Sequence, residues 1–448
     1  MTTIPNARIW QPDGWQDGLK FGLDLYGRIR EAVRGGTIGQ RVVPGIANLH
    51  SHAFQRAMAG MAERQLRADD SFWSWREAMY RFAQQLDPDA MRAVAAQLYA
   101  EMLEAGYTTV CEFHYLHHAP DGRPYDDPAA MSRALIAAAH DTGIRLTLLP
   151  VLYMAGGFDG RALDARQQRF GHDVDGYLRL LDGLRAEQGD TVRIGCALHS
   201  LRAVPEAAMR ELLAGLPDDS RIHIHIAEQL AEVEQCLEHR GARPVQWLLD
   251  NAGPDPRWTL VHATHLDDAE VADLARSGAT VAVCPTTEAN LGDGLFPLRQ
   301  YLDAGGRLGI GSDSHISVSP VEELRWLEYG QRLVTRRRNI AVGSDSPSVG
   351  HTLLRAVAAS AGDSSGHDIG LLQPGRFADA LVLDVRAPQF AGASDDDAID
   401  RWVFSGNRNL VRETWVGGRC LAENGRHLRA DSIAADYRTA VERMLAAQ

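Results

Sequence analysis

Lysine is almost absent from this chain of 448 residues, because Lys20 is its one lysine and all other basic side chains are arginines. Cysteine is also scarce: the 5 cysteines are scattered and odd in number, which argues against a disulfide framework and favours a reducing compartment. No apolar run approaches the roughly 20 residues that a transmembrane helix needs, and the first residues lack the basic and apolar regions of a signal peptide. We therefore expect a cytoplasmic protein without a membrane partner.

Positive charge is in deficit, with 46 Lys and Arg residues against 59 Asp and Glu and a formal net charge of -13 at pH 7. This balance disfavours binding to phosphate backbones, so we expect no nucleic-acid partner. The composition, 45% hydrophobic and 23% charged, is that of a soluble globular protein. A chain of this length predicts one large domain and a smaller one.

The central part of the chain, from about residue 44, repeats a short apolar run, a loop, a helix and a small turn. The runs are nearly continuous in apolar residues, which is typical of parallel strands buried on both faces. They predict strands at 46–52, 108–115, 145–153, 193–199, 221–227, 258–262, 279–284 and 307–313. Eight such units indicate an α/β fold, a (β/α)8 TIM-type barrel over residues 44–370. The alternative is an open doubly wound sheet, but the even number of units favours the closed barrel.

The two flanks of the chain have a different pattern, in which polar and apolar residues alternate over short stretches such as 19–25 and 378–384. This alternation is typical of strands with one buried face. We therefore expect residues 1–43 and 371–448 to form one small discontinuous β domain from both chain ends, with a surface helix at the C-terminus.

Candidate metal ligands stand at the ends of the predicted strands. His50 and His52 are two residues apart in a strand, so their side chains point the same way and can meet one ion. His225 and Asp313 also end predicted strands, and together the four make the set of three or slightly more ligands that a catalytic zinc takes. A single histidine is more often structural. The joint pattern nevertheless favours a metal site, with His262 at a further strand end.

Several segments resemble the metal-site motifs of the amidohydrolase superfamily: residues 44–52, 224–228, 261–264 and 311–314. Residues 370–380 resemble its C-terminal β-domain signature, so the resemblance covers nearly the whole chain. It implies a metal-dependent hydrolase that acts on a C–N bond, and a homodimer. Within the superfamily, residues 48–60 are similar to deiminases that release ammonia from a linear formimino group.

The resemblance also bears on the number of metal ions. Binuclear members of the superfamily bridge their ions with a carboxylated lysine on the fourth strand, whereas residues 193–199 contain no lysine. We therefore expect one ion per chain. The nitrogen-rich ligand set favours Zn2+, with Fe2+ or another divalent ion left open.

The same resemblance implies catalytic roles for three residues. His262 would help to remove a proton from water, although a fifth metal ligand is the alternative. Asp313 would accept a proton while it contacts the metal. Glu228, three residues after His225, would relay a proton to the departing ammonia. Its alternative is a solvated charge at the start of a helix, where a carboxylate is favoured.

The substrate implied by the resemblance is a small dicarboxylate, and the forked guanidinium of arginine suits carboxylates well. Arg202, three residues after His199, and Arg76, in the long segment after the first barrel strand, are the candidates. They are singled out from many surface arginines by their position on strand-end loops. Gln55, Tyr115 and His199 match further substrate-binding positions of the family.

Two other functions are compatible with the sequence. One is an aminohydrolase acting on a nucleobase or related ring, of the guanine or triazine type, which would share the metal, His262 and Glu228 but would favour aromatic stacking. The other is a non-catalytic metal-binding scaffold that kept the barrel. The complete set of candidate ligands argues against the scaffold.

Overall fold

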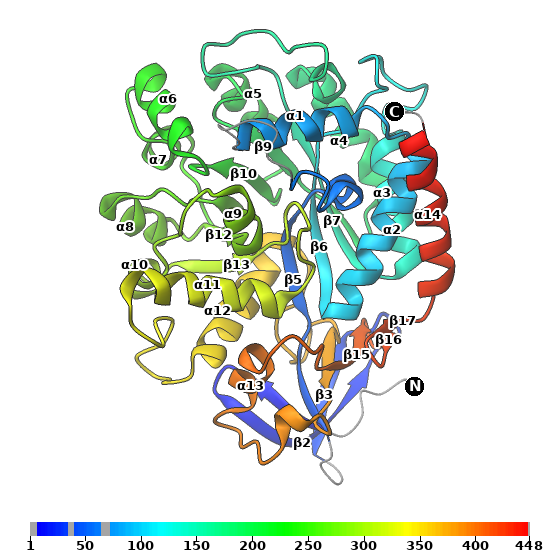
Figure 1. The fold of residues 1–448 in the computed structure, drawn as a ribbon, viewed down its shortest axis with the longest axis vertical. Coiled ribbons are helices and arrows are strands. Elements are labelled where there is room, and N and C mark those ends of the chain that lie inside the picture. Colours follow the sequence, from blue (N-terminus) through cyan, green and yellow to red (C-terminus); the bar gives the residue numbers. More distant parts are fainter. Residues whose placement is uncertain (1–6, 35–39, 64–71, 447–448) are drawn as a thin grey trace.

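The centre of the molecule is a closed barrel of parallel strands (Figure 1). The computed structural model describes residues 7–34, 40–63 and 72–446. Within these residues, β13 pairs with β5, and the additional pairing of β6 with β7 closes the sheet into a ring. The strand segments of the barrel are β5 (Ile46–Ser51), β6 (Tyr107–His114), β7 (Arg145–Leu152), β8 (Val192–Ile194), β9 (Cys196–Ser200), β10 (Ile222–Ile226), β11 (Trp258–His262), β12 (Thr280–Val283) and β13 (Arg307–Ile310). The predicted closed barrel is thus confirmed, and the open sheet is excluded.

Helices connect consecutive barrel strands and cover the outside of the barrel (Figure 1). They are α1 (Phe72–Ala83), α2 (Pro88–Ala105), α3 (Ala130–Thr142), α4 (Val174–Leu184), α5 (Glu206–Gly215), α6 (Leu230–Arg240), α7 (Pro244–Ala252), α8 (Asp268–Ser277), α9 (Pro285–Leu291), α10 (Leu298–Asp303), α11 (Pro320–Thr335) and α12 (Val349–Ser365), with short 3-10 turns η1 (Ala53–Met58), η2 (Gln168–Phe170) and η3 (Arg185–Glu187). No helix among the described ranges is long and apolar enough to cross a membrane.

Local sequence sets the ends of α2 and thereby the start of β6. The side chain of Asp87 accepts the backbone N–H of Ala90, and Pro88 occupies the first helical position, where a missing N–H costs nothing. Gly106 ends the helix at a left-handed φ of 112°, and a Cβ atom there would lie 2.9 Å from Leu381. Glycine is therefore required both for the backbone conformation and for the close approach.

A second sheet is built from both ends of the chain, and the early and late strands lie side by side below the barrel in Figure 1. Its strand order is β17-β16-β15-β14-β4-β1-β2-β3. The strands are β1 (Ala7–Gln11), β2 (Gly14–Leu23), β3 (Ile29–Arg34), β4 (Arg41–Pro44), β14 (Ala380–Leu383), β15 (Val411–Val416), β16 (Arg419–Glu423) and β17 (Arg426–His427), joined by η4 (Pro388–Phe390) and α13 (Ala398–Phe404). The two flanks meet where β4 pairs with β1 on one side and β14 on the other.

The small sheet and the barrel are joined by a buried ion pair and by the last helix. The guanidinium of Arg145, at the start of β7, donates to both carboxylate oxygens of Asp379 at 2.9 and 3.0 Å. The C-terminal helix α14 (Ala430–Ala446) packs along α2 of the barrel, and Arg443 forms an ion pair with Asp87 at 2.9 Å. The helix at the C-terminus therefore lies on the barrel, while the division of the chain at residues 43 and 370 stays a prediction.

Candidate metal centre and active site

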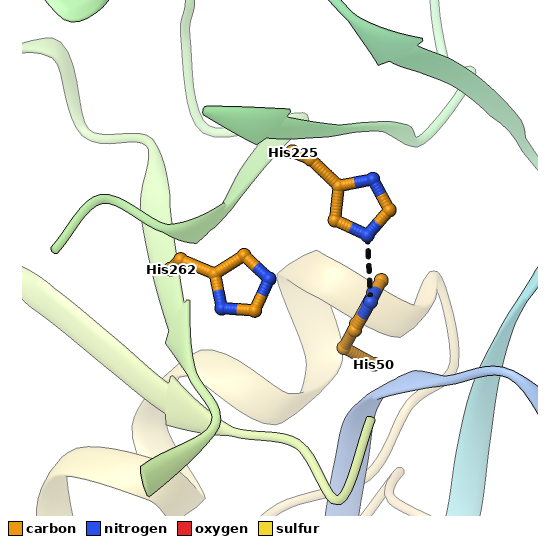
Figure 2. Close-up of side chains that lie close together, drawn as sticks. All are labelled: His50, His225 and His262. Carbon is orange, nitrogen blue, oxygen red and sulfur yellow. Dashed lines mark hydrogen bonds between the residues drawn. The ribbon is translucent and has the colours of Figure 1, made fainter. Parts of the chain in front are cut away.

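Four predicted ligands meet at the carboxyl ends of three barrel strands. The Nε2 atom of His50 lies 3.1 Å from Nε2 of His52 and 3.0 Å from Nε2 of His225 (Figure 2). Oδ1 of Asp313 lies 3.5 Å from Nε2 of His50 and 3.4 Å from Nε2 of His52. All four side chains are buried. The barrel therefore brings together residues that are far apart in the sequence, with their ligand atoms facing one point.

The other ring nitrogen fixes the orientation of two of these histidines. Nδ1 of His52 donates to the carbonyl of Phe113 at 2.8 Å, and Nδ1 of His225 donates to the carbonyl of His199 at 3.0 Å. Because a carbonyl only accepts, each Nδ1 carries the proton and each Nε2 presents a lone pair. Burial lowers the pKa of His50, His52 and His225, so these rings are neutral near pH 7.

These atoms fit a divalent metal ion better than a hydrogen-bonded cluster. Nε2 of His50 carries at most one proton, so it can serve only one of the two lone pairs that face it. Ligand atoms bound to one ion at about 2.0–2.2 Å are roughly 3.0–3.6 Å apart. The separations among His50, His52 and Asp313, and that between His50 and His225, run from 3.0 to 3.5 Å. Neutral imidazoles with one carboxylate make a donor set that suits zinc.

The peptide backbone around Asp313 places it beside the two histidines of β5. Its N–H donates to the carbonyl of His50 at 3.0 Å, and its carbonyl accepts the N–H of His52 at 3.2 Å. Asn48 fixes the same junction, because its Oδ1 accepts the N–H of Ser312 at 3.1 Å and its Nδ2 donates to the Ser312 hydroxyl at 2.6 Å. Asp313 has a left-handed φ of 44°, a conformation that non-glycine residues rarely adopt outside sites that require it.

His262 lies next to the centre and is surrounded by carboxylates. Its Nε2 atom is 3.8 Å from Oε1 of Glu228 and 3.8 Å from Oδ2 of Asp313, and its Nδ1 atom is 3.2 Å from Oε1 of Glu288. Burial alone would lower the pKa of His262, but the three carboxylates outweigh it and raise the pKa to about 10. Burial also raises the pKa of Glu228 to about 7, against the effect of His262. The two side chains can therefore hold and exchange a proton near neutral pH.

His262 also remains available as a further ligand. One of its ring nitrogens lies within 4.8 Å of ring nitrogens of both His50 and His225. Figure 2 shows the three rings facing one another from three strands. The position of His262 beside the ligand cluster is therefore compatible with both interpretations, a proton carrier and a fifth ligand.

The five predicted substrate residues line one pocket that opens onto the ligand cluster. Its walls include Gln55, Arg76, Tyr115, His199 and Arg202, together with His52, His225, Glu228, His262 and Asp313. Nε2 of Gln55 donates to the Tyr115 hydroxyl at 3.0 Å. The buried Oε1 atom of Gln55 has no hydrogen-bond partner within the described residues. An unpaired acceptor in the pocket wall suits a ligand that brings an N–H group.

The surroundings of His262 and the pocket wall also contain functional candidates that the sequence did not reveal. Glu288, in the first turn of α9, bonds to His262 and also accepts the N–H of Cys284 at 2.8 Å. Tyr80, Tyr153 and Glu232 line the pocket itself, which Glu288 does not. Tyr153 stands at the end of a predicted strand, a position that could have marked it, whereas Tyr80 and Glu232 lie on helices where such residues are common.

The fold, the ligand cluster and the neighbouring acid–base pair together describe a hydrolytic enzyme with a barrel-end active site. A model of the amidohydrolase family matches residues 41–421. The chain therefore belongs to the amidohydrolase family, as the sequence motifs predicted.

Two curated relatives and one solved structure can be compared with this chain individually. The chain is 50% identical over 444 residues to a formimidoylglutamate deiminase from Pseudomonas aeruginosa, with 98% of each chain covered. It is 26% identical over 409 residues to an 8-oxoguanine deaminase from the same species, with 87% of each chain covered. Among solved structures, an amidohydrolase from Brucella melitensis superposes with a TM-score of 0.92 at 43% identity, covering 98% of this chain and 99% of that one.

Proposed function

We propose that this protein hydrolyses the formimino group of N-formimino-L-glutamate, giving N-formyl-L-glutamate and ammonia. The observation that carries the proposal is a single pocket lined by His52, His225 and Asp313 of the ligand cluster, by the proposed acid–base residue Glu228 and by the two arginines Arg76 and Arg202. The deiminase from Pseudomonas aeruginosa, half identical over nearly the whole chain, supports this substrate.

Substrate recognition follows from charge and from hydrogen-bonding capacity. The substrate carries two carboxylates, and the chain has a formal net charge of -13, so a local positive potential is needed to bind them. Arg76 and Arg202 supply that potential in the pocket wall. Burial lowers the pKa of the His199 ring, and the positive charges of both arginines lower it further. The unpaired Oε1 atom of Gln55 is placed to accept an N–H of the formimino group.

We infer one zinc ion per chain, held by His50, His52, His225 and Asp313. When bound, this ion would acidify a water molecule and, through its charge, lower the pKa of His262 toward neutrality. The absence of lysine from β8 and β9 supports a single ion, and Lys20 lies in β2 of the other sheet. Fe2+ or another divalent ion remains compatible with the same donors.

The residues around the pocket account for the proton transfers of the reaction. Attack of the water oxygen on the formimino carbon frees a proton, which Asp313 or His262 accepts. Glu228 donates a proton to the imino nitrogen, and a second proton, returned through Glu228 and His262, makes that nitrogen a neutral leaving group. The C–N bond then breaks as the C=O bond of the formyl group forms, and ammonia leaves. The two protons of one water molecule thus balance the ammonia released.

The cellular setting belongs to the same proposal. We infer a place in histidine degradation, a cytoplasmic location and a homodimer. The resemblance to the superfamily supports the first and third of these. The free state of all 5 cysteines in the described part of the chain supports a reducing compartment.

The deciding experiment compares ammonia release from three substrates with protein of measured metal content. N-formimino-L-glutamate should give the largest kcat/KM, above a neutral formamidine and above guanine. Guanine tests the alternative function, an aminohydrolase that acts on a nucleobase ring, because the chain is also similar to an 8-oxoguanine deaminase. If either of the other two substrates gives the larger kcat/KM, dicarboxylate recognition is the wrong interpretation of this pocket.

A further inference from the structure

Gln167 holds two tyrosine hydroxyls of the pocket wall from behind. Its Nε2 atom donates to the hydroxyl of Tyr153 at 3.0 Å and to that of Tyr80 at 3.3 Å. The orientation of the amide is fixed, because its Oε1 atom accepts the backbone N–H of Asp164 at 3.0 Å. A flipped amide would place an NH2 group against that N–H. Gln167 is buried and stands immediately before η2, so it contacts the two tyrosines without lining the pocket itself.

The hydrogens that Gln167, Tyr80 and Tyr153 carry determine which of these side chains donate hydrogen bonds and which accept them. The amide supplies both hydrogens to Tyr80 and Tyr153, whose oxygens therefore act as acceptors toward Gln167. Each hydroxyl keeps its own hydrogen, and the two hydroxyls also interact with each other. One hydroxyl can donate to the other, but the second hydrogen then has no acceptor among the described residues. At least one hydroxyl donor thus points away from Gln167.

The direction away from Gln167 leads into the pocket, next to the two arginines. Tyr80 and Tyr153 both line the pocket that contains Arg76 and Arg202. The guanidinium of Arg76 lies 5.3 Å from the ring centre of Tyr80. Burial raises the pKa of the Tyr153 hydroxyl, and the positive charges of both arginines act in the opposite direction. The ring of Phe170, from η2, packs against both tyrosines. Its centre lies 5.6 Å from the ring centre of Tyr80 and 5.8 Å from that of Tyr153. Two cations and hydroxyl donors on one wall form a site for an anion.

We propose that the pair Tyr80 and Tyr153 donates at least one hydrogen bond to a carboxylate of the bound substrate, and that Gln167 is the positioning residue that prevents both hydroxyls from donating toward it. The proposal rests on the proposed function for its substrate and extends it by naming the groups that select for a carboxylate. A ligand without an acceptor oxygen gains nothing from this arrangement, because nothing then accepts the hydroxyl hydrogens.

The test replaces Gln167 by Glu, which keeps the shape and still accepts the Asp164 N–H but offers acceptors to the tyrosines. Their hydrogens then turn toward residue 167 and away from the pocket. Gln168→Glu is the matched control, since Gln168 is the exposed neighbour and receives the same charge. Calorimetry with N-formyl-L-glutamate and kinetics with N-formimino-L-glutamate and a neutral formamidine are measured for parent and both variants.

We expect Gln167→Glu to raise Kd for N-formyl-L-glutamate and KM for N-formimino-L-glutamate by about tenfold or more, with kcat within about threefold of the parent. Gln168→Glu should change both by less than about twofold, and the neutral formamidine should react equally with all three proteins. Equal losses on the charged and neutral substrates, or equal effects of the two Glu variants, would overturn the proposal.

A second variant keeps the test informative if Gln167→Glu folds poorly. Tyr153→Phe removes one hydroxyl without adding charge and should also raise Kd for N-formyl-L-glutamate. An unchanged Kd in both Tyr153→Phe and Tyr80→Phe would contradict the donor role. The binding measurement does not depend on turnover. A parent that binds the dicarboxylate through these groups but releases no ammonia from N-formimino-L-glutamate would refute the proposed reaction and leave this inference standing.

Discussion

The Nδ1 atom of His262 lies 3.2 Å from Oε1 of Glu288, and this contact turns the Nε2 atom of the same ring toward Glu228 and Asp313. The same Glu288 oxygen accepts the N–H of Cys284, so one carboxylate joins the ends of two neighbouring strands. His262 itself has a left-handed φ of 70°, which few residues adopt without support from their surroundings. The position of the His262 ring is therefore set by its neighbours.

We predict that His262→Asn and Glu228→Gln keep the metal but lose turnover. In the proposed reaction each residue supplies a proton-transfer step, which is typically worth roughly a hundred- to ten-thousand-fold in rate. Steady-state kcat and metal analysis on the same preparations check this. A variant that turns over within a few-fold of the parent would show that its residue has another role, and loss of metal from His262→Asn would make it a ligand.

Replacement of a ligand should remove metal and activity together. We expect His52→Asn and His225→Asn to lose most of the bound ion, because an incomplete ligand set binds weakly. His140→Asn, an exposed position on α3, is the matched control and should keep both. Elemental analysis should find one divalent ion per active chain. Two equivalents, both needed for turnover, would contradict the single-ion proposal.

The role of Arg202 can be measured as substrate discrimination. Charge-assisted hydrogen bonds contribute roughly 1.5–3 kcal/mol each, so Arg202→Met should lower kcat/KM for N-formimino-L-glutamate by at least about tenfold. Metal content and activity on a neutral formamidine should stay the same. Arg210→Met, at an exposed position on α5 where the arginine pairs with Glu206, provides the control for loss of one charge. Equal losses on both substrates would point to a structural defect.

Acid should weaken the fold through its buried histidines, and His172 allows a direct test. Burial lowers the pKa of His172 to about 4, and the nearby His118 acts in the same direction. In the unfolded chain this histidine binds a proton near pH 6.5, whereas in the folded chain it stays neutral down to about pH 4. The free energy of unfolding therefore falls as pH drops from about 6.5 to 4.

The expected size is up to about 1.4 kcal/mol per pH unit for one such group. His172→Gln should therefore flatten the dependence of the unfolding free energy on pH in this range, whatever its effect at pH 7. His140→Gln, with an exposed side chain, should leave the slope of the parent unchanged. Denaturant unfolding at several pH values measures these slopes, and identical slopes for parent and His172→Gln would refute the prediction.

Much of the barrel was predictable because its strands are buried on both faces and so are marked by unbroken apolar runs. The predicted strand at 258–262 has the bounds of β11, and the predicted strand at 46–52 extends one residue beyond β5. The predicted strand at 193–199 is instead divided at Gly195 into β8 and β9. A side chain at Gly195 would collide with Leu149 and the carbonyl of Arg221, a constraint that exists only in the folded packing.

The candidate site was predictable where position along a strand fixes direction, as for His50 and His52. It was not predictable where the contact depends on which loops fold over the barrel end. Gln167 meets Tyr80 across 87 positions of the chain, and Glu288 meets His262 across 26. A glutamine in a loop or a glutamate in a helix has many neutral explanations, and nothing local separates these two from the rest.

The buried ion pair between Arg145 and Asp379 has a consequence for how the molecule comes apart. If the small sheet detached while the barrel stayed folded, this ion pair would be lost together with the ring of Phe377, whose centre lies 3.8 Å from the Arg145 guanidinium. Asp379 is also tied to the backbone, because it accepts the N–H of Gly417 at 2.7 Å and its carbonyl accepts the N–H of Gly45 at 2.9 Å. Barrel and small sheet should therefore melt in a single cooperative transition, and neither should survive as an independent folding unit.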